Sequence, residues 1–216
     1  WDGKLYRFDG MESIYSQDDV PANMGKQIRS LGAAITGISV DPNNPNHVVI
    51  SVGGYGTVNT GKVQETFNAL ADAPDWNNIW NVNDLDRMPC YDVIIDAMDP
   101  SGETILVGTE YGVFATDNGG ADWVISNQNM ASTSSQITAP VFDLKQQWRG
   151  AAAWINPSNQ GAIYAGTHGR GIFRSDLFLG TNDPTDDAVV NAQVLQVYPN
   201  PVNGSSVTVQ SEAMRG

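Results

Sequence analysis

Short apolar strands recur along the middle of the chain, each separated from the next by a turn. Residues 35–56, 89–114 and 140–173 share one order of features. Each segment begins with alternating apolar residues, turns at an Asp-Pro or Asn-Pro pair, continues into a second apolar run and reaches a glycine-containing turn. Alternation with a period of two is typical of a strand with one buried face. The pattern therefore predicts antiparallel strands joined by tight turns.

The three segments repeat at a nearly constant interval. Gly53, Gly108 and Gly166 occupy matching turns, about 55 residues apart. In the last two segments a third strand begins with Gly-aliphatic-Phe, at Gly112 and Gly171. Three or four short strands per unit at this period favour a β-propeller, whose blades repeat about every 40–50 residues before loop insertions. A β-sandwich with similar hairpins is the alternative.

Changes in pattern divide the chain into four predicted regions. Residues 1–34 are expected to hold the end of a preceding blade and then, from residue 11, an irregular polar loop. About three blades are expected over 35–176, a linker over 177–193 and the beginning of another domain over 194–216. Propellers have four to eight blades, so we expect an incomplete ring in this chain. We also expect the native N-terminus, with any signal peptide, to lie upstream.

Composition excludes several classes of function. The formal net charge is −13, and such a field repels nucleic acid and anionic membrane surfaces. The chain contains 19 Asn, 19 Asp, 22 Gly and 11 Pro, residue types that build turns. No apolar run reaches the roughly 20 residues that span a bilayer. The single cysteine, Cys90, excludes an intramolecular disulfide and a Cys-based zinc cluster. These features predict a soluble, acidic, turn-rich all-β protein.

A recognisable turn motif follows the third strand of the middle unit. The segment TDNGGADW at 116–123 resembles the Asp-box, in which Ser/Thr, Asp and Gly precede a Trp that closes the turn. The expected participants are Thr116, Asp117, Gly119 and Trp123, with one residue more than the tightest spacing. A short Asp side chain can accept backbone hydrogen bonds, and glycine can adopt positive φ. A structural turn is therefore favoured over a catalytic acid or a calcium ligand at Asp117.

The other two units lack a complete box. In the first unit, residues 65–80 occupy the corresponding place, and Trp76 or Trp80 is expected to supply the ring. The third unit ends at residues 174–176 without completing the motif.

Taken together, these phrases carry a family resemblance. Three segments are similar to sortilin-like and neuraminidase-repeat propellers of large secreted proteins from Bacteroidetes-type bacteria. They are DPNNPNHVVISVGGYG, ILVGTEYGVFATDNGGADW and AIYAGTHGRGIF. The resemblance covers about 140 residues, from Ile35 to Asp176. It implies a secreted or surface-displayed β-propeller.

The C-terminal segment resembles a second known element. We expect a turn at Tyr198, Pro199, Asn200 and Pro201, because the two prolines fix φ and favour an extended Asn between them. The phrase is similar to the opening of the C-terminal sorting domain of type IX secretion cargo, a small β-sandwich. The resemblance implies contact with the type IX translocon and its outer-membrane shuttle protein. An ordinary Pro-rich turn between β-domains is the alternative.

Catalytic and metal-binding signatures are weak. The seven arginines are scattered, and the two histidines, His47 and His168, lack metal-ligand spacing. His168 and Arg170, set among glycines, are the candidate binding residues, although a turn against a neighbouring blade is the safer interpretation. Asp183, Asp186 and Asp187 could hold structural calcium, but a solvated acidic turn is favoured. We expect no cofactor.

The sequence thus predicts an all-β fold, with β-propeller blades followed by the first strands of a small β-sandwich sorting domain. The predicted function is a non-catalytic binding or display module, exported through the periplasm and outer membrane to the cell surface or medium. A glycan or a protein is the expected ligand. The alternative is a propeller glycoside hydrolase of the sialidase or xyloglucan-degrading type, which requires two suitably spaced carboxylates.

Overall fold

The computed structural model contains thirteen β-strands among the residues that it describes. It describes residues 3–21, 24–56, 61–82, 87–127, 130, 139–150, 157 and 159–175. Within these residues the only helices are two short 3-10 turns, η1 (Met11–Ser13) and η2 (Gln17–Asp19). The all-β prediction is confirmed. None of the described helices has the length and hydropathy that crossing a bilayer requires.

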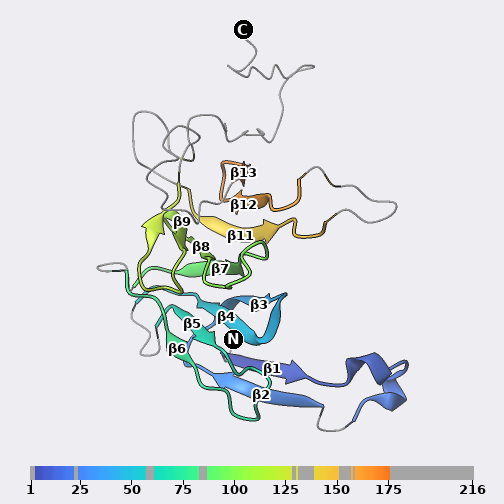
Figure 1. The fold of residues 1–216 in the computed structure, drawn as a ribbon. Helices are drawn as coiled ribbons and strands as arrows, with labels where there is room; N and C mark the ends of the chain where they lie inside the picture. Colours follow the sequence, from blue (N-terminus) through green and yellow to red (C-terminus); the bar gives the residue numbers. More distant parts are fainter. Residues whose placement is uncertain are drawn as a thin grey trace.

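The strands form four antiparallel sheets in chain order (Figure 1). The first sheet pairs β1 (Lys4–Phe8) with β2 (Gly25–Ser30). Blade 1 consists of β3 (Ile35–Asp41), β4 (Asn44–Val52), β5 (Val63–Thr66) and β6 (Asn77–Asn78). Blade 2 consists of β7 (Cys90–Ile95), β8 (Ile105–Thr109), β9 (Gly112–Thr116) and β10 (Val124–Ile125). Blade 3 consists of β11 (Val141–Gln146), β12 (Ile163–Thr167) and β13 (Ile172–Ser175).

The three blades share the same irregularity in strand pairing. In each blade the first strand skips one residue near its start when it pairs with the second strand. The skipped residues are Thr36, Tyr91 and Phe142. A bulge of this kind re-aims a side chain and bends the strand. The repeat seen in the sequence is therefore a repeat of backbone geometry as well.

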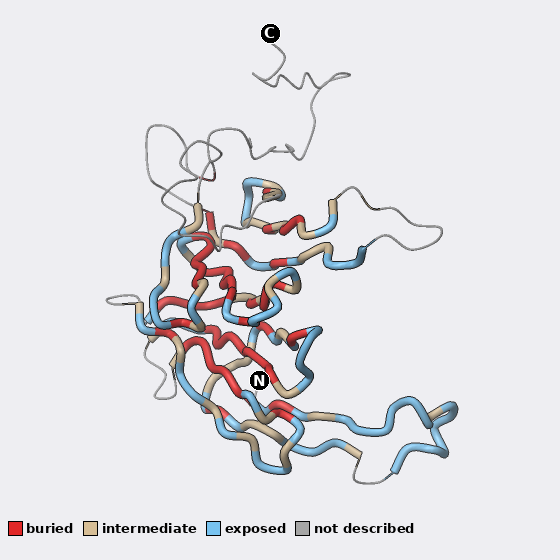
Figure 2. Tube along the Cα trace, in the orientation of Figure 1, coloured by how far each residue is buried: buried red, intermediate tan, exposed pale blue. Residues whose placement is uncertain are grey.

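The sheets stack face to face, and the hydrophobic core lies between them (Figures 1 and 2). Alternation along β4 divides its apolar residues between two neighbours. Val49 faces blade 2, whereas Val48, Ile50 and Val52 face the first sheet. A stack of more than two sheets excludes the two-layer sandwich, and consecutive meandering sheets joined in this way are blades of a β-propeller.

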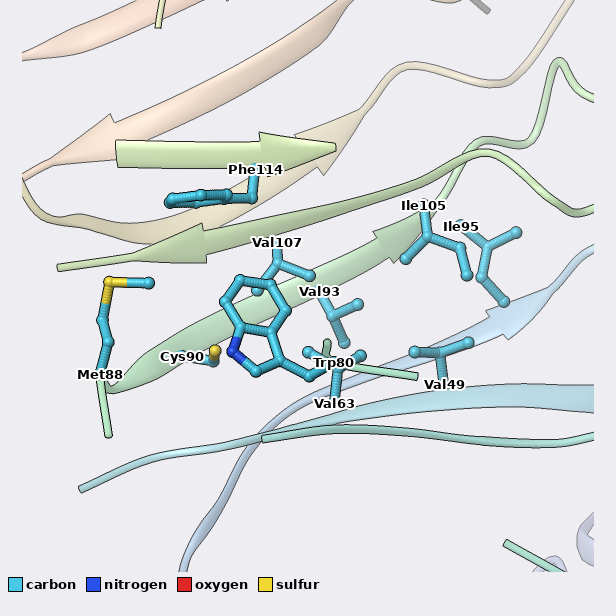
Figure 3. Packing of buried hydrophobic residues seen from close by; sticks show 10 residues of the cluster. All are labelled: Val49, Val63, Trp80, Met88, Cys90, Val93, Ile95, Ile105, Val107 and Phe114. Carbon is cyan, nitrogen blue, oxygen red and sulfur yellow. The ribbon is translucent and has the colours of Figure 1, made fainter. Parts of the chain in front are cut away.

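The interface between blades 1 and 2 shows how the stack is stabilised (Figure 3). Trp80 packs edge-on against Phe114, with ring centroids 5.5 Å apart. Val93 and Val107 of blade 2 complete the contact with Val49. Each fully buried aliphatic side chain contributes about 1.5–3 kcal/mol through the hydrophobic effect. Stacking therefore buries apolar faces that each sheet would otherwise expose to water.

Polar side chains also connect the first strands of consecutive blades. Thr36 Oγ1 donates to the carbonyl of Cys90 at 2.7 Å, and the Ile95 amide donates to Ser39 Oγ at 2.9 Å. Between blades 2 and 3, the Leu144 amide donates to Asp92 Oδ2 at 2.8 Å. These bonds hold β3, β7 and β11 side by side along one edge of the stack.

Two strands lie where the sequence was interpreted differently. Residues 25–30, expected to belong to an irregular loop, form β2, because pairing with β1 stabilises a segment whose only aliphatic residue is Ile28. In blade 1, β5 is buried along its whole length although Gln64, Glu65 and Thr66 are polar. Their side chains all have hydrogen-bond partners, so burial carries no unpaired polar group.

The predictions for the C-terminal region fall outside the described residues. They comprise the linker at 177–193, the acidic residues Asp183, Asp186 and Asp187, the sorting domain from 194, and its turn at Tyr198, Pro199, Asn200 and Pro201.

Candidate functional site

The box-like turn of blade 2 is closed by Asn118. Thr116 Oγ1 donates to Asn118 Oδ1 at 2.8 Å, and the same oxygen accepts the Asp122 amide at 3.0 Å. Thr116 Oγ1 in turn accepts the amide of Gly120 at 3.0 Å. Asn118 thus accepts the hydrogen bonds that close the turn, the role that the motif suggests for Asp117, the residue before it. Thr116 takes part in this turn through both bonds of its hydroxyl.

Glycine has a defined role at two positions of this turn. Gly119 adopts φ +64° and Gly120 adopts φ +85°. A Cβ on Gly120 would lie 2.8 Å from Ile79 Cβ, so Gly120 also permits close approach of blade 1. Both features favour glycine, which has no Cβ.

Blade 1 contains the same turn with a longer loop. Thr66 Oγ1 donates to Asn68 Oδ1 at 2.8 Å, and the Asp75 amide donates to the same oxygen at 2.9 Å. Seven positions separate Asn68 from Asp75, against four between the equivalent residues of blade 2. Because its loop is longer, this turn was not recognised from the sequence. The Thr-x-Asn and Asp-Trp pairs that both turns share could have identified it.

The tryptophans of both turns bond to the preceding sheet. Trp123 Nε1 donates to the Ile79 carbonyl at 2.8 Å, and Trp76 Nε1 donates to the Ile28 carbonyl at 3.1 Å. Of the two candidates in blade 1, Trp76 therefore supplies the ring, and Trp80 belongs to the core. Each turn fastens its blade to its neighbour, which is a structural role.

A different set of side chains gathers at the end of the stack where the first strands begin. In every blade, the residue after the second strand donates its amide to the residue before the first strand. The pairs are Gly53 with Ala34 at 3.0 Å, Glu110 with Pro89 at 3.4 Å, and His168 with Pro140 at 2.9 Å. These bonds bring each loop residue close to the bulge of its own blade. The loop residues and the bulge residues therefore share one end of the stack.

Side chains from blades 2 and 3 form a continuous line at this end. The rings of Tyr91 and Phe142 meet edge to face with centroids 4.6 Å apart. Phe142 also contacts the His168 ring, at 5.4 Å. The Tyr91 hydroxyl donates to Glu110 Oε2 at 2.5 Å. We call Tyr91, Glu110, Phe142 and His168 the rim row.

The electrostatics of the row are set by the Tyr91–Glu110 pair. Partial burial and the hydrogen bond to Glu110 raise the pKa of the Tyr91 phenol well above its usual range. The phenol therefore stays protonated and donating at neutral pH. Phe142 is 47% exposed, and His168 is exposed beside it.

The two predicted binding residues, His168 and Arg170, contact different parts of the chain. His168 belongs to the rim row. Arg170 donates through Nη1 to the Met130 carbonyl at 3.2 Å and so contacts the chain that precedes blade 3. Sequence reasoning missed Tyr91 and Phe142 as a pair, although each precedes an Asp in matching units.

Several other carboxylates have structural roles. Asp92 accepts the Leu144 amide and lies 3.2 Å from Lys145 Nζ, and Asp143 lies 2.5 Å from the same Nζ. In blade 1, Asp41 and Glu65 contact the two ring nitrogens of His47, and all three residues are buried. Across the described part of the chain, no group of three or more His, Cys, Asp and Glu residues is arranged to hold a metal ion.

Comparisons with known proteins place the chain among distant structural neighbours. No protein-family model and no curated protein matches it. It is similar to the GH74 xyloglucanase from Xanthomonas campestris, with 17% identity, 82% of this chain and 27% of that chain covered, and a TM-score of 0.41. It is also similar to YCF48 from Cyanidioschyzon merolae, with 14% identity, coverage of 67% and 54%, and a TM-score of 0.30. The chain spans only part of the length of both proteins.

Proposed function

We propose that this chain belongs to a non-catalytic binding module of a secreted or surface-displayed β-propeller protein, with the rim row as its binding surface. The observation that carries the proposal is the Tyr91–Phe142–His168 contact, a line of rings drawn from two blades and partly open to solvent. Binding sites combine apolar surface with a few placed polar groups, and Glu110 and His168 supply those groups.

The internal repeat supports this choice of surface. Positions that build the blades keep their residue types in the Thr-x-Asn turns of blades 1 and 2 and in the largely aliphatic second strands of all three. The bulge position instead carries Thr36, Tyr91 and Phe142 in successive blades, and the backbone geometry is the same in all three. Variation of side chains on a constant backbone is what a recognition surface requires.

Hydrolysis of glycosides is the second candidate, and one observation favours it. The Tyr91 hydroxyl and Glu110 form a short hydrogen bond at the exposed rim, and some glycosidases use a tyrosine nucleophile. The raised pKa of Tyr91 argues against it, because a nucleophilic phenol must lose its proton.

One experiment separates binding from hydrolysis. The purified chain is applied to a glycan array and a peptide array, and the same polysaccharides are assayed in solution for new reducing ends. We expect retention of at least one ligand class without product, and loss of retention in Phe142→Ala. New reducing ends that disappear in Glu110→Gln would establish the hydrolase, and retention unchanged by Phe142→Ala would remove the rim row from the function.

The route to the cell surface forms a second part of the proposal. We propose export through a type IX pathway of Bacteroidetes type, because the segment from 194 resembles a sorting domain and Tyr198–Pro201 resembles its opening turn. In a bacterium with this pathway, Pro199→Ala combined with Pro201→Ala in the full-length protein is expected to cause periplasmic accumulation. Asp186→Ala in the linker is the matched control. Unchanged export of the double variant would overturn this part.

A further inference from the structure

The rim row has features that define the class of ligand it suits. This inference rests on the proposed binding function and narrows it. Phe142 presents a partly exposed apolar ring that contacts two other rings, Tyr91 at 4.6 Å and His168 at 5.4 Å. A ring already fixed by its neighbours loses little conformational freedom when a ligand packs against it. The surface is therefore prepared for a ligand with an apolar face.

The polar groups of the rim row suit a ligand rich in hydroxyls. An ionised carboxylate offers about four acceptor sites, and Tyr91 occupies one oxygen of Glu110. Glu110 can therefore accept further hydrogen bonds from a ligand. His168, which contacts Phe142, can donate or accept through its ring nitrogens. A pyranose ring offers both an apolar C–H face and hydroxyl groups at its edge.

Charge argues for a neutral ligand. The chain carries a net charge of −13, and Glu110 belongs to the row itself, so polyanions such as uronans and sialic acid polymers are repelled. An uncharged polysaccharide carries no carboxylate, sulfate or phosphate and avoids this repulsion.

The arrangement along the blades points to a polymer. Tyr91 and Phe142 occupy equivalent positions on neighbouring blades, so the row extends from one blade to the next. An extended chain of sugars can contact both positions at once. We propose that the rim row binds a neutral polysaccharide, with one sugar ring packed against Phe142 and its hydroxyls donating to Glu110.

Affinity electrophoresis of the purified 216-residue chain tests this proposal. The gels contain galactomannan, laminarin or hydroxyethylcellulose as neutral probes, and polygalacturonate or colominic acid as anionic probes. We expect retardation by at least one neutral probe and by neither anionic probe. Phe142→Ala should weaken binding by about tenfold, the order expected for one lost aromatic contact. Phe142→Trp, which keeps an aromatic ring, should bind.

The control variant is Tyr15→Ala. Tyr15 is 90% exposed and lies between η1 and η2 on the β1–β2 connection, which extends away from the blades (Figure 1). Its removal should leave retardation unchanged. The proposal is overturned if no neutral probe retards the chain, if an anionic probe binds more tightly, or if Phe142→Ala binds like the unaltered chain. Retention of a peptide through Phe142 would overturn it as well, while leaving the proposed binding function standing.

Discussion

His47 Nε2 lies 2.8 Å from Glu65 Oε1 in the interior of blade 1. On the other side of the ring, Nδ1 lies 3.3 Å from Asp41 Oδ2. Both nitrogens can donate to carboxylates only when the imidazole carries two protons. The arrangement therefore assigns a positive charge to this buried ring. The Phe67 ring stacks on the imidazole at 4.5 Å, and Gly102 of blade 2 packs against the Asp41 and His47 side chains.

The stability of the protein should depend on pH through His47. Burial acts to lower the pKa of His47, but the hydrogen bonds and charges of Glu65 and Asp41 outweigh burial and raise it. A raised folded-state pKa gives stability that is complete below the unfolded value of about 6.5 and is lost as pH rises through the folded value. Urea unfolding over a pH series should show this decrease.

The variant His47→Gln should flatten that part of the pH profile, and His168→Gln, at an exposed position, should leave it intact. Parallel profiles for the unaltered chain and His47→Gln would contradict the assignment.

Asn118→Ala should lower the free energy of unfolding by about 1–2 kcal/mol, because Asn118 Oδ1 accepts both the Thr116 hydroxyl and the Asp122 amide. The neighbouring substitution Asp117→Ala is the matched control and should change it by less than about 0.5 kcal/mol. Chemical denaturation measures both. A larger loss of unfolding free energy for Asp117→Ala would show that Asp117, as the sequence motif suggests, stabilises the turn.

Gly37→Ala should destabilise the contact between blades 1 and 2. A Cβ on Gly37 would lie 2.6 Å from Asp92 Oδ1 and 2.8 Å from the Asp92 Cα, and backbone cannot move aside cheaply. We expect a loss of about 1–3 kcal/mol, the range for overpacked sites, seen as a lower Tm. Gly32→Ala, where no atom lies within 4 Å of the added Cβ, should leave Tm nearly unchanged. Equal Tm values for the two variants would argue against close packing here.

The thiol of Cys90 should be inert in the folded protein. Burial raises the pKa of Cys90 to about 12, and the thiolate is the reactive form. Reaction with a thiol reagent such as 5,5′-dithiobis(2-nitrobenzoic acid) at pH 8 should be slow until urea unfolds the chain. Rapid labelling under native conditions would show that the core between blades 1 and 2 opens readily.

Much of the fold could be predicted from local pattern. Alternating residues such as Val93 and Ile95, followed by an Asp-Pro turn, specify a strand and its end through interactions within a few residues. Repetition of this pattern at a constant interval then indicated blades. The exceptions were β2 and β5, whose polar residues are held in strands by pairing partners and by hydrogen bonds to residues such as Arg29 and His47.

By itself, the sequence determined the fold class, the strand repeat and the turn chemistry, including a Thr-to-Trp turn in blade 2, since all of these depend on near neighbours along the chain. Only the tertiary structure decided that Asn118 rather than Asp117 closes this turn, that Trp76 has the same role in blade 1, and that His168 lies beside Phe142. Side-chain geometry within the turn selects Asn118. The other two outcomes depend on contacts between residues more than 20 positions apart, Trp76 with Ile28 and His168 with Phe142. Stacking of the blades creates these contacts, and no local pattern encodes them.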